Sequence, residues 1–219
     1  MEKYLPLLKR TQLFSGIGEE DIASMLQCLQ ATLRFYKKGD AIFRQGQRIR
    51  HIALLAEGCL HVQRDDYWGN RSIIGVIEAG DMFAESYAGS QCGPMPNDVI
   101  AVADSAVLFF DVERVLTVCS AGCRFHAMVV KNLYFAISEK NRKLMQKLGH
   151  MTKRTTREKL ISYLSEEARR QNSGTFTIPF NRQQLADFLS VDRSAMSGEL
   201  CKMRDDGLLS FAKNQFTLH

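Results

Sequence analysis

The stretch FNRQQLADFLSVDRSAMSGELCKMRDDGLL, from Phe180 to Leu209, predicts two short amphipathic helices separated by a tight turn. Asn181 is a favourable N-cap for the first helix, with Gln184 placed as in a capping box, and Asp192 is a favourable N-cap for the second. Apolar residues recur on one face of each helix at Leu185, Phe188, Leu189, Met196, Leu200 and Met203. The pair predicts a helix-turn-helix, whose second helix enters the major groove of DNA.

The face that these apolar residues leave free carries the candidate DNA contacts. Arg193, Ser194 and Ser197 stand near the start of the second helix, where side chains reach base edges. The candidates for phosphate contacts, which position a protein without reading sequence, are Arg182, Lys202, Lys213, Lys153, Arg154 and Arg157. After Gly207, Leu208–Ser210 and Gln215–Leu218 predict a two-stranded wing. Two packed helices with a solvated polar face are the alternative. Cys201 follows Leu200 on the apolar stripe and is predicted to lie at the edge of the core.

The charge is distributed unevenly along the chain, which has a net charge of +5. Residues 140–219 hold 15 Lys and Arg against 8 Asp and Glu, whereas residues 1–139 hold 14 against 16. A basic C-terminal third behind a near-neutral body favours a polyanion as the partner. A solvated charged surface would give the same totals, so the charge supports the helix-turn-helix interpretation without deciding it.

Residues 31 to 113 predict a β domain made of short strands with glycine turns between them. The expected strands are Leu33–Tyr36, Ala41–Phe43, His51–Ala56, Leu60–Arg64, Ser72–Ile77, Val99–Ala103 and Ala106–Phe110. Many short strands of this kind are typical of an antiparallel β-roll or jelly roll. Residues 14 to 30 predict a preceding helix, because Ile22, Met25 and Leu29 recur at helical spacing.

Residues 124 to 148 contain neither Pro nor Gly and predict one long helix that ends at Gly149. Its apolar stripe includes Val129, Leu133, Ile137 and Leu144, for which self-pairing in a dimer is the simplest use. Packing against its own β domain is the alternative, and near the start of the helix we expect both. Thr155 and Glu158 predict a capping box for the next helix. The expected α+β organisation is a β-roll domain at 1–121, a dimerisation helix at 122–150 and a winged helix-turn-helix at 151–219.

This order of elements resembles the CRP/FNR family of bacterial transcription regulators over nearly the whole chain. The residues that carry the resemblance are KKGDAIFRQGQRIRHIALLAEGCLHV (37–62), AGDMFAES (79–86) and the opening stretch at 180–209. The resemblance implies a homodimer that binds a palindromic site, with half-sites about 34 Å apart. It also implies contact with RNA polymerase, and an effector domain that repositions the two recognition helices.

Departures from the family pattern bear on the effector. Members that bind cyclic AMP carry an Arg-Ser pair where this chain has Pro96-Asn97, so a bidentate partner for the cyclic phosphate is missing and cyclic AMP is not expected. Glu85 is kept, and with Ser86 and Asn97 it marks the candidate effector pocket. No cysteine precedes Cys28, which argues against the iron–sulfur sensor of oxygen-sensing members. Ser190 replaces the usual Gly of the turn, and Gly198 replaces an Arg of the recognition helix.

Cys119, Cys123 and His126, in VCSAGCRFH (118–126), form a candidate sensor where the β domain meets the long helix. Thiolates and imidazole suit zinc, haem or redox chemistry, so a metal, haem or redox thiols could supply the signal. Three ligands are one short of a closed structural zinc site. Two buried thiols and a polar histidine near a dimer interface are therefore the favoured alternative.

Other function classes fit the sequence less well. No apolar run approaches the roughly 20 residues of a membrane span, the N-terminus predicts no secretory signal, and six scattered cysteines fit a reducing cytosol. The sequence contains no recognisable nucleophile–base pair or phosphate-binding loop, so it does not predict catalysis. A cupin-like enzyme would need several His and Glu metal ligands on the strands, and the strands do not supply them. A cyclic-nucleotide-like module that regulates a partner protein is the second reading. We expect a cytoplasmic, homodimeric, sequence-specific DNA-binding transcription regulator under an unidentified effector or redox signal.

Overall fold

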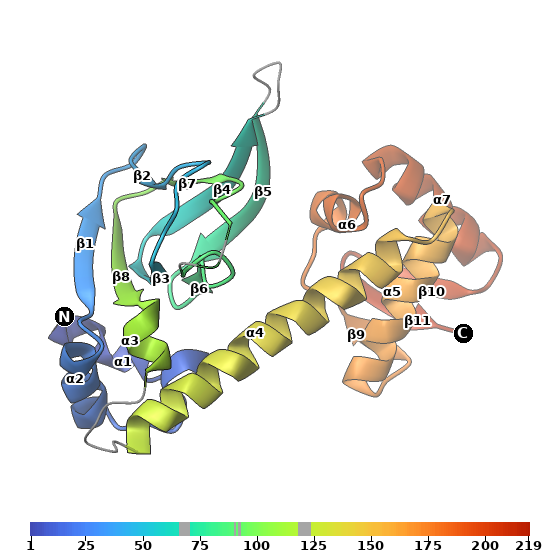
Figure 1. Ribbon diagram of the computed structural model, residues 1–219. Coiled ribbons are helices and arrows are strands. Elements are labelled where there is room, and N and C mark those ends of the chain that lie inside the picture. The colour runs from blue at the N-terminus through green and yellow to red at the C-terminus, as the bar shows by residue number, and fades with distance from the viewer. Residues whose placement is uncertain (66–70, 90, 92, 118–123) are drawn as a thin grey trace. The chain divides into compact units, whose positions relative to one another are not determined.

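The computed structural model describes residues 1–65, 71–89, 91, 93–117 and 124–219 (Figure 1). The chain divides into two compact units, Met1–Ser138 and Glu139–His219. In the described part of the chain, no helix is both long enough and apolar enough to cross a membrane.

The N-terminal unit is built on two four-stranded antiparallel sheets, as the glycine-punctuated strands predict. The first has the order β1-β8-β3-β6, with bounds Thr32–Tyr36, Ser105–Asp111, His51–Glu57 and Met82–Phe83. The second has the order β2-β7-β4-β5, with bounds Ala41–Phe43, Asp98–Ala101, Cys59–Asp65 and Arg71–Glu78. Alternate residues of β3 serve two cores: Ala53 and Leu55 pack with the second sheet's residues, whereas Ile52 and Leu54 pack under helices.

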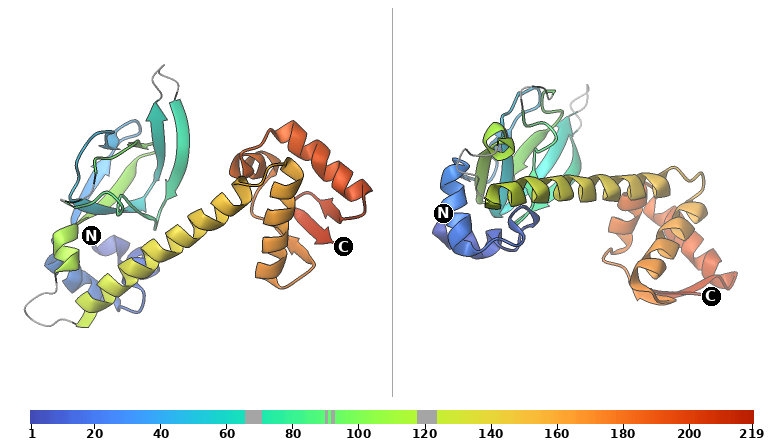
Figure 2. Two further views of the ribbon diagram at one scale, coloured as in Figure 1. Left: turned by 45° about the vertical axis from the view of Figure 1, so that its right-hand side comes forward. Right: turned by 60° about the horizontal axis from the view of Figure 1, so that its bottom comes forward.

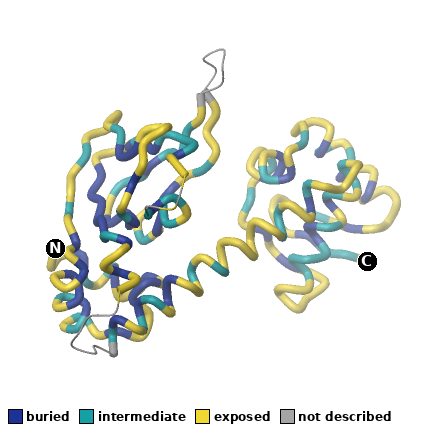
Figure 3. The backbone as a smooth tube through the Cα atoms, viewed as in Figure 1, coloured by how far each residue is buried: buried dark blue, intermediate teal, exposed yellow. Residues whose placement is uncertain are grey.

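Helical segments share a core with one face of the first sheet and gather beneath β1 and β8 in Figure 1. Figure 3 shows buried residues along these segments. They are η1 (Glu2–Tyr4), α1 (Leu5–Leu8), η2 (Gln12–Phe14), α2 (Glu19–Cys28) and α3 (Val112–Leu116). The long helix α4 (Arg124–Met151) joins this core through its first half, where Val129 and Leu133 are buried. Asn132 of α4 donates two hydrogen bonds, to the Leu13 carbonyl at 3.1 Å and to the Ser15 carbonyl at 2.9 Å.

The predicted end of α4 at Gly149 is wrong, because the helix continues through that glycine to Met151. A mid-helix glycine costs only about 1 kcal/mol relative to alanine. Packing of the next residue outweighs that cost: the His150 side chain is 5% exposed and lies edge-on to the Tyr163 ring at 5.7 Å.

The C-terminal unit places three helices on a small sheet (Figure 2). The helices are α5 (Thr156–Gln171), α6 (Arg182–Leu189) and α7 (Arg193–Asp205). The sheet has the order β10-β11-β9, with bounds Leu209–Ala212, Gln215–Leu218 and Thr175–Thr177. The wing therefore has a third strand, β9, that the sequence pattern does not reveal.

Candidate nucleic-acid interface

The helix-turn-helix is assembled by the caps that its sequence predicts. Asn181 Oδ1 accepts from the Gln184 N–H and Gln184 Oε1 accepts from the Asn181 N–H, both at 2.9 Å. Asp192 Oδ1 accepts from the Ala195 N–H at 2.8 Å and begins α7. Hydrogen bonds from the Ser194 hydroxyl and, to a smaller extent, from backbone N–H groups lower the pKa of the Asp192 carboxyl. This N-cap is therefore kept ionised. The capping box of α5, Thr155 with Glu158, is also formed.

The turn between α6 and α7 is formed by Ser190 and is held by Lys159 of α5, whose contacts there the sequence does not reveal. Ser190 takes the left-handed conformation, with φ of 50°, where glycine is the usual residue. Lys159 of α5 reaches the end of α6 and donates to the carbonyls of Leu189, at 3.2 Å, and Ser190, at 3.4 Å. These carbonyls have no intrahelical partner, so the lysine satisfies them and fixes the turn.

One face of α7 is buried and the other is free. Met196, Leu200 and Met203 pack into the core with α5, α6 and the sheet. Arg193, Ser194, Gly198, Cys201 and Lys202 are exposed, and Ser197 is half-buried. Cys201 therefore lies on the free face, one turn after Ser197, and its predicted place at the core edge is wrong. The helical period decides this, since position 201 falls on the row of 194 and 197.

The two serines of the free face have their hydroxyl hydrogens engaged. Ser194 Oγ donates to Asp192 Oδ1 at 2.6 Å, and Ser197 Oγ donates to the Arg193 carbonyl at 2.9 Å. Their oxygens retain lone pairs, which suit the amino donors of cytosine or adenine in the major groove. Gly198 leaves a gap beside them, because a Cβ built there meets nothing within 4 Å.

Three of the six phosphate candidates make intramolecular side-chain contacts. Lys202 Nζ lies 4.0 Å from Glu199 Oε2 and stays exposed, whereas two arginines are held more closely. The Arg182 guanidinium lies over the Phe211 and Phe216 rings, 4.9 and 5.0 Å from their centroids, and burial lowers its pKa. Arg157 hydrogen-bonds Asp206, and it reaches Glu199 at 3.5 Å. Both arginines tie elements of this unit together, which argues against the phosphate role predicted for them. Lys153, Arg154, Lys202 and Lys213 are exposed.

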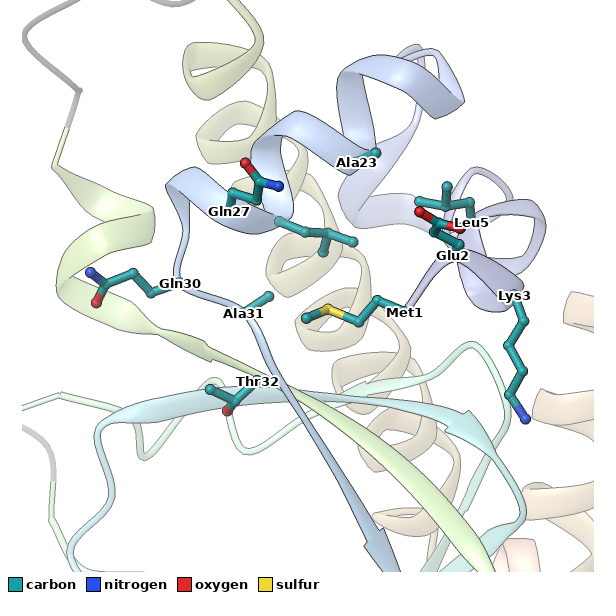
Figure 4. A pocket seen from close by; sticks show the side chains of 10 residues that line it. Met1, Glu2, Lys3, Leu5, Ala23, Gln27, Gln30, Ala31 and Thr32 are labelled. Atoms are coloured by element: carbon teal, nitrogen blue, oxygen red, sulfur yellow. The ribbon is translucent and has the colours of Figure 1, made fainter.

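The candidate effector residues lie in the N-terminal unit. Glu85 follows β6 with one carboxylate oxygen buried, and Ser86 beside it is exposed. Asn97 Oδ1 accepts from Arg64 Nε of β4 at 3.0 Å, a partner that the sequence did not suggest. None of the five principal cavities among the described residues is lined by this trio. The largest, about 740 Å³, lies between the start of the chain, α2 and Thr32 (Figure 4).

The candidate sensor is only partly visible. Cys119 and Cys123 lie outside the described residues. His126 is 2% exposed, and its Nε2 lies 2.9 Å from the Val115 carbonyl. Because a carbonyl only accepts, Nε2 carries a hydrogen. Within the described ranges the buried Nδ1 has no hydrogen-bond partner, and no metal-binding group of three His, Cys, Asp or Glu is formed.

The four predicted dimerisation residues separate into two pairs. Val129 and Leu133 are 0% and 5% exposed in the chain's own core. Ile137 and Leu144 are 40% and 65% exposed. The first pair serves the fold of the N-terminal unit, and the second pair is available to a partner.

Comparison with known proteins agrees with both units. The cyclic nucleotide-binding domain family matches residues 33–121, and the Crp-like helix-turn-helix domain family matches residues 158–219. Transcriptional activator protein FnrL of Cereibacter sphaeroides is 25% identical over 190 residues, which cover 81% of this chain and 72% of FnrL. Cyclic AMP receptor protein of Thermus thermophilus is 23% identical over 202 residues, covering 92% and 89%. The solved structure of CprK complexed with OCPA has a similar fold, with a TM-score of 0.62 at 15% identity, covering 89% and 88%.

A nucleotide-binding-type β domain, a long helix and a capped helix-turn-helix with a wing define a DNA-binding transcription regulator, not an enzyme. The chain belongs to the CRP/FNR family of these regulators.

Proposed function

We propose that the chain acts as a homodimer that binds a palindromic DNA site and regulates transcription, together with RNA polymerase, in response to a signal other than cyclic AMP. The observation that carries the DNA part is the free face of α7, with Arg193, Ser194 and Ser197 over a fully buried opposite face. Arg193 is the strongest candidate for direct readout, because an arginine fork matches the two acceptors of guanine. Lys153, Arg154, Lys202 and Lys213 would contact phosphates.

The row of side chains along α4 supports self-pairing. Val130, Tyr134, Ile137, Asn141, Leu144 and Leu148 follow one another at alternating intervals of four and three residues. Tyr134, Ile137, Leu144 and Leu148 are 40% to 67% exposed. A seam with this period fits a two-stranded coiled coil. Asn141 occupies one inward position of the seam, where a single asparagine favours a parallel, in-register pair. Parallel pairing would bring together two copies of the DNA-binding unit, as a palindrome requires.

Two features support a signal other than cyclic AMP. Pro96 and Asn97 supply no guanidinium for the cyclic phosphate, and the Asn97 amide already accepts from Arg64. The buried Nδ1 of His126, which has no hydrogen-bond partner among the described residues, supports a ligand or thiol partner near the start of α4. Binding of a metal or haem, or a redox change, at this place would alter the packing of α4 on the N-terminal unit. We propose that the protein acts in the cytoplasm.

Selection of binding sites from random duplexes by the full chain tests the proposal. A two-fold symmetric consensus, with half-sites about one DNA turn apart, is the expected outcome. Enrichment of single half-sites or of no sequence would contradict it. The purified protein should be examined in parallel by absorbance and metal analysis, and titrated with cyclic AMP. Saturable binding of cyclic AMP at micromolar concentration would overturn the effector part alone.

A further inference from the structure

We propose that the N-terminal unit contains a second, separate site, which binds a small organic anion with a flat apolar body. It is the cavity of about 350 Å³ between β1, residues 47–51 and β8. Its size falls at the lower end of small-molecule sites, which are usually about 300–1,000 Å³. Glu85, Ser86 and Asn97 do not line this cavity, so the inference is independent of the candidate effector pocket.

The charge of the cavity wall is of one sign. Arg34, Arg48, Arg50 and His51 are among its ten lining residues, and none of the ten is acidic. Asp40 and Asp111, which precede β2 and end β8, do not line the cavity; Asp40 Oδ2 accepts from the Lys37 N–H at 2.7 Å, and Asp111 Oδ1 from the Arg114 N–H at 3.2 Å. Three guanidinium groups around one small cavity favour a carboxylate or phosphate as the head of the ligand.

Arg34 is positioned before any ligand arrives. Its guanidinium carbon lies 5.4 Å from the centroid of the Phe109 ring, and its charge acts on the neighbouring Tyr36 phenol. Burial raises the pKa of Tyr36, although Arg34 opposes the rise, so the phenol stays protonated at neutral pH. A guanidinium fixed on an aromatic ring loses little conformational entropy when it binds an anion.

The floor of the cavity is apolar and aromatic. Ile42, Phe43, Ile49 and Phe109 are each 5% to 7% exposed. Phe43 and His51 both meet the Phe109 ring edge-on, at 5.9 and 6.3 Å between centroids. An ion without an apolar part would make no contact with these apolar side chains. The combination of basic wall and aromatic floor therefore favours an aryl carboxylate or aryl phosphate over inorganic phosphate.

Calorimetric titration of the full chain tests the site with four probes: phenyl phosphate, benzoate, inorganic phosphate and benzyl alcohol. We expect saturable binding of phenyl phosphate or benzoate, which also identifies the preferred head group, weaker binding of inorganic phosphate and none of benzyl alcohol. Arg34→Gln should weaken binding of the preferred probe at least tenfold. Arg10→Gln, an exposed arginine of the same unit outside the cavity, should not.

Several results would overturn the site. The first is that neither aryl anion binds saturably. The second is that Arg34→Gln and Arg10→Gln weaken binding of the probe equally. The third is that inorganic phosphate binds as tightly as phenyl phosphate. Binding of an oligoglutamate peptide without binding of the aryl anions would indicate a protein-docking surface instead. If Arg34→Gln fails to fold by circular dichroism, Arg48→Gln takes its place, because Arg48 is exposed on the same wall.

Discussion

The ammonium of Lys159 lies 3.2 Å from the Leu189 carbonyl, so a side chain of α5 closes the end of α6. Removing it leaves carbonyls at the turn without this donor, and a lost hydrogen bond of a charged group costs roughly 1.5–3 kcal/mol. We expect Lys159→Met to lower the free energy of unfolding of the C-terminal unit by an amount in this range. Urea denaturation followed by circular dichroism measures it. Lys153→Met, an exposed lysine of the preceding segment, is the matched control and should change stability little.

Arg193 and Lys202 should affect DNA binding in different ways. Arg193→Ala should cost about 1–3 kcal/mol at the specific site and relax the preference at one base pair, as expected for the loss of the proposed arginine–base contact. Lys202→Ala should weaken specific and non-specific duplexes alike and reduce the salt dependence by about one ion, as expected for the loss of a phosphate contact. Fluorescence anisotropy at several salt concentrations separates the two. An unchanged consensus for Arg193→Ala would remove that residue from the readout.

Charged substitutions along α4 should have opposite consequences on its two faces. Ile137→Asp and Leu144→Asp should give folded monomers that lose palindromic DNA, since both side chains are exposed in the single chain. Leu133→Asp should instead unfold the N-terminal unit, because Leu133 is buried in its core. Sedimentation and circular dichroism distinguish these results. A wild-type chain that sediments as a monomer at micromolar concentration, yet binds full sites tightly, would refute the dimer.

Asn141 offers a finer test of the same seam. Asn141→Leu should raise the stability of the pair while loosening its register and stoichiometry, as expected when a polar inward residue is replaced. Thermal unfolding at several protein concentrations and sedimentation equilibrium measure the two effects. Leucine at a position outside the seam would change neither property.

The buried His150 predicts a pH dependence of stability. Burial lowers its pKa below the ordinary 6.5, more than Glu166 and Glu167 raise it, and Lys153 lowers it further. The unfolded chain therefore binds the proton more readily than the folded chain. This contribution to stability is fully present above about pH 6.5 and is lost as pH falls through the folded pKa. Urea denaturation between pH 5 and pH 8 checks the slope, which His150→Gln should flatten.

Local sequence patterns predicted most of the helices and strands. Contacts between residues far apart in the sequence could not be predicted in this way. The caps at Thr155, Asn181 and Asp192 were identifiable because each bonds a residue three positions later. Lys159 at the turn, and Arg182 over two phenylalanine rings, depend on partners 29 to 34 residues away in the sequence. No periodicity reveals such partners. Likewise β9 has only three residues, too few for a recognisable pattern, and it forms a strand because it pairs with β11.

The gap at Gly198 bears on how regulators of this kind acquire new targets. A Cβ added there meets nothing within 4 Å, and Gly198 lies on the exposed face of α7 proposed to contact DNA. Replacing a mid-helix glycine also gains up to about 1 kcal/mol of helix stability. If this face reads DNA as proposed, a mutation at this one position is expected to change the preferred DNA site without harming the fold. The position is open to divergence after gene duplication, because a new preference and a firmer helix would arise together.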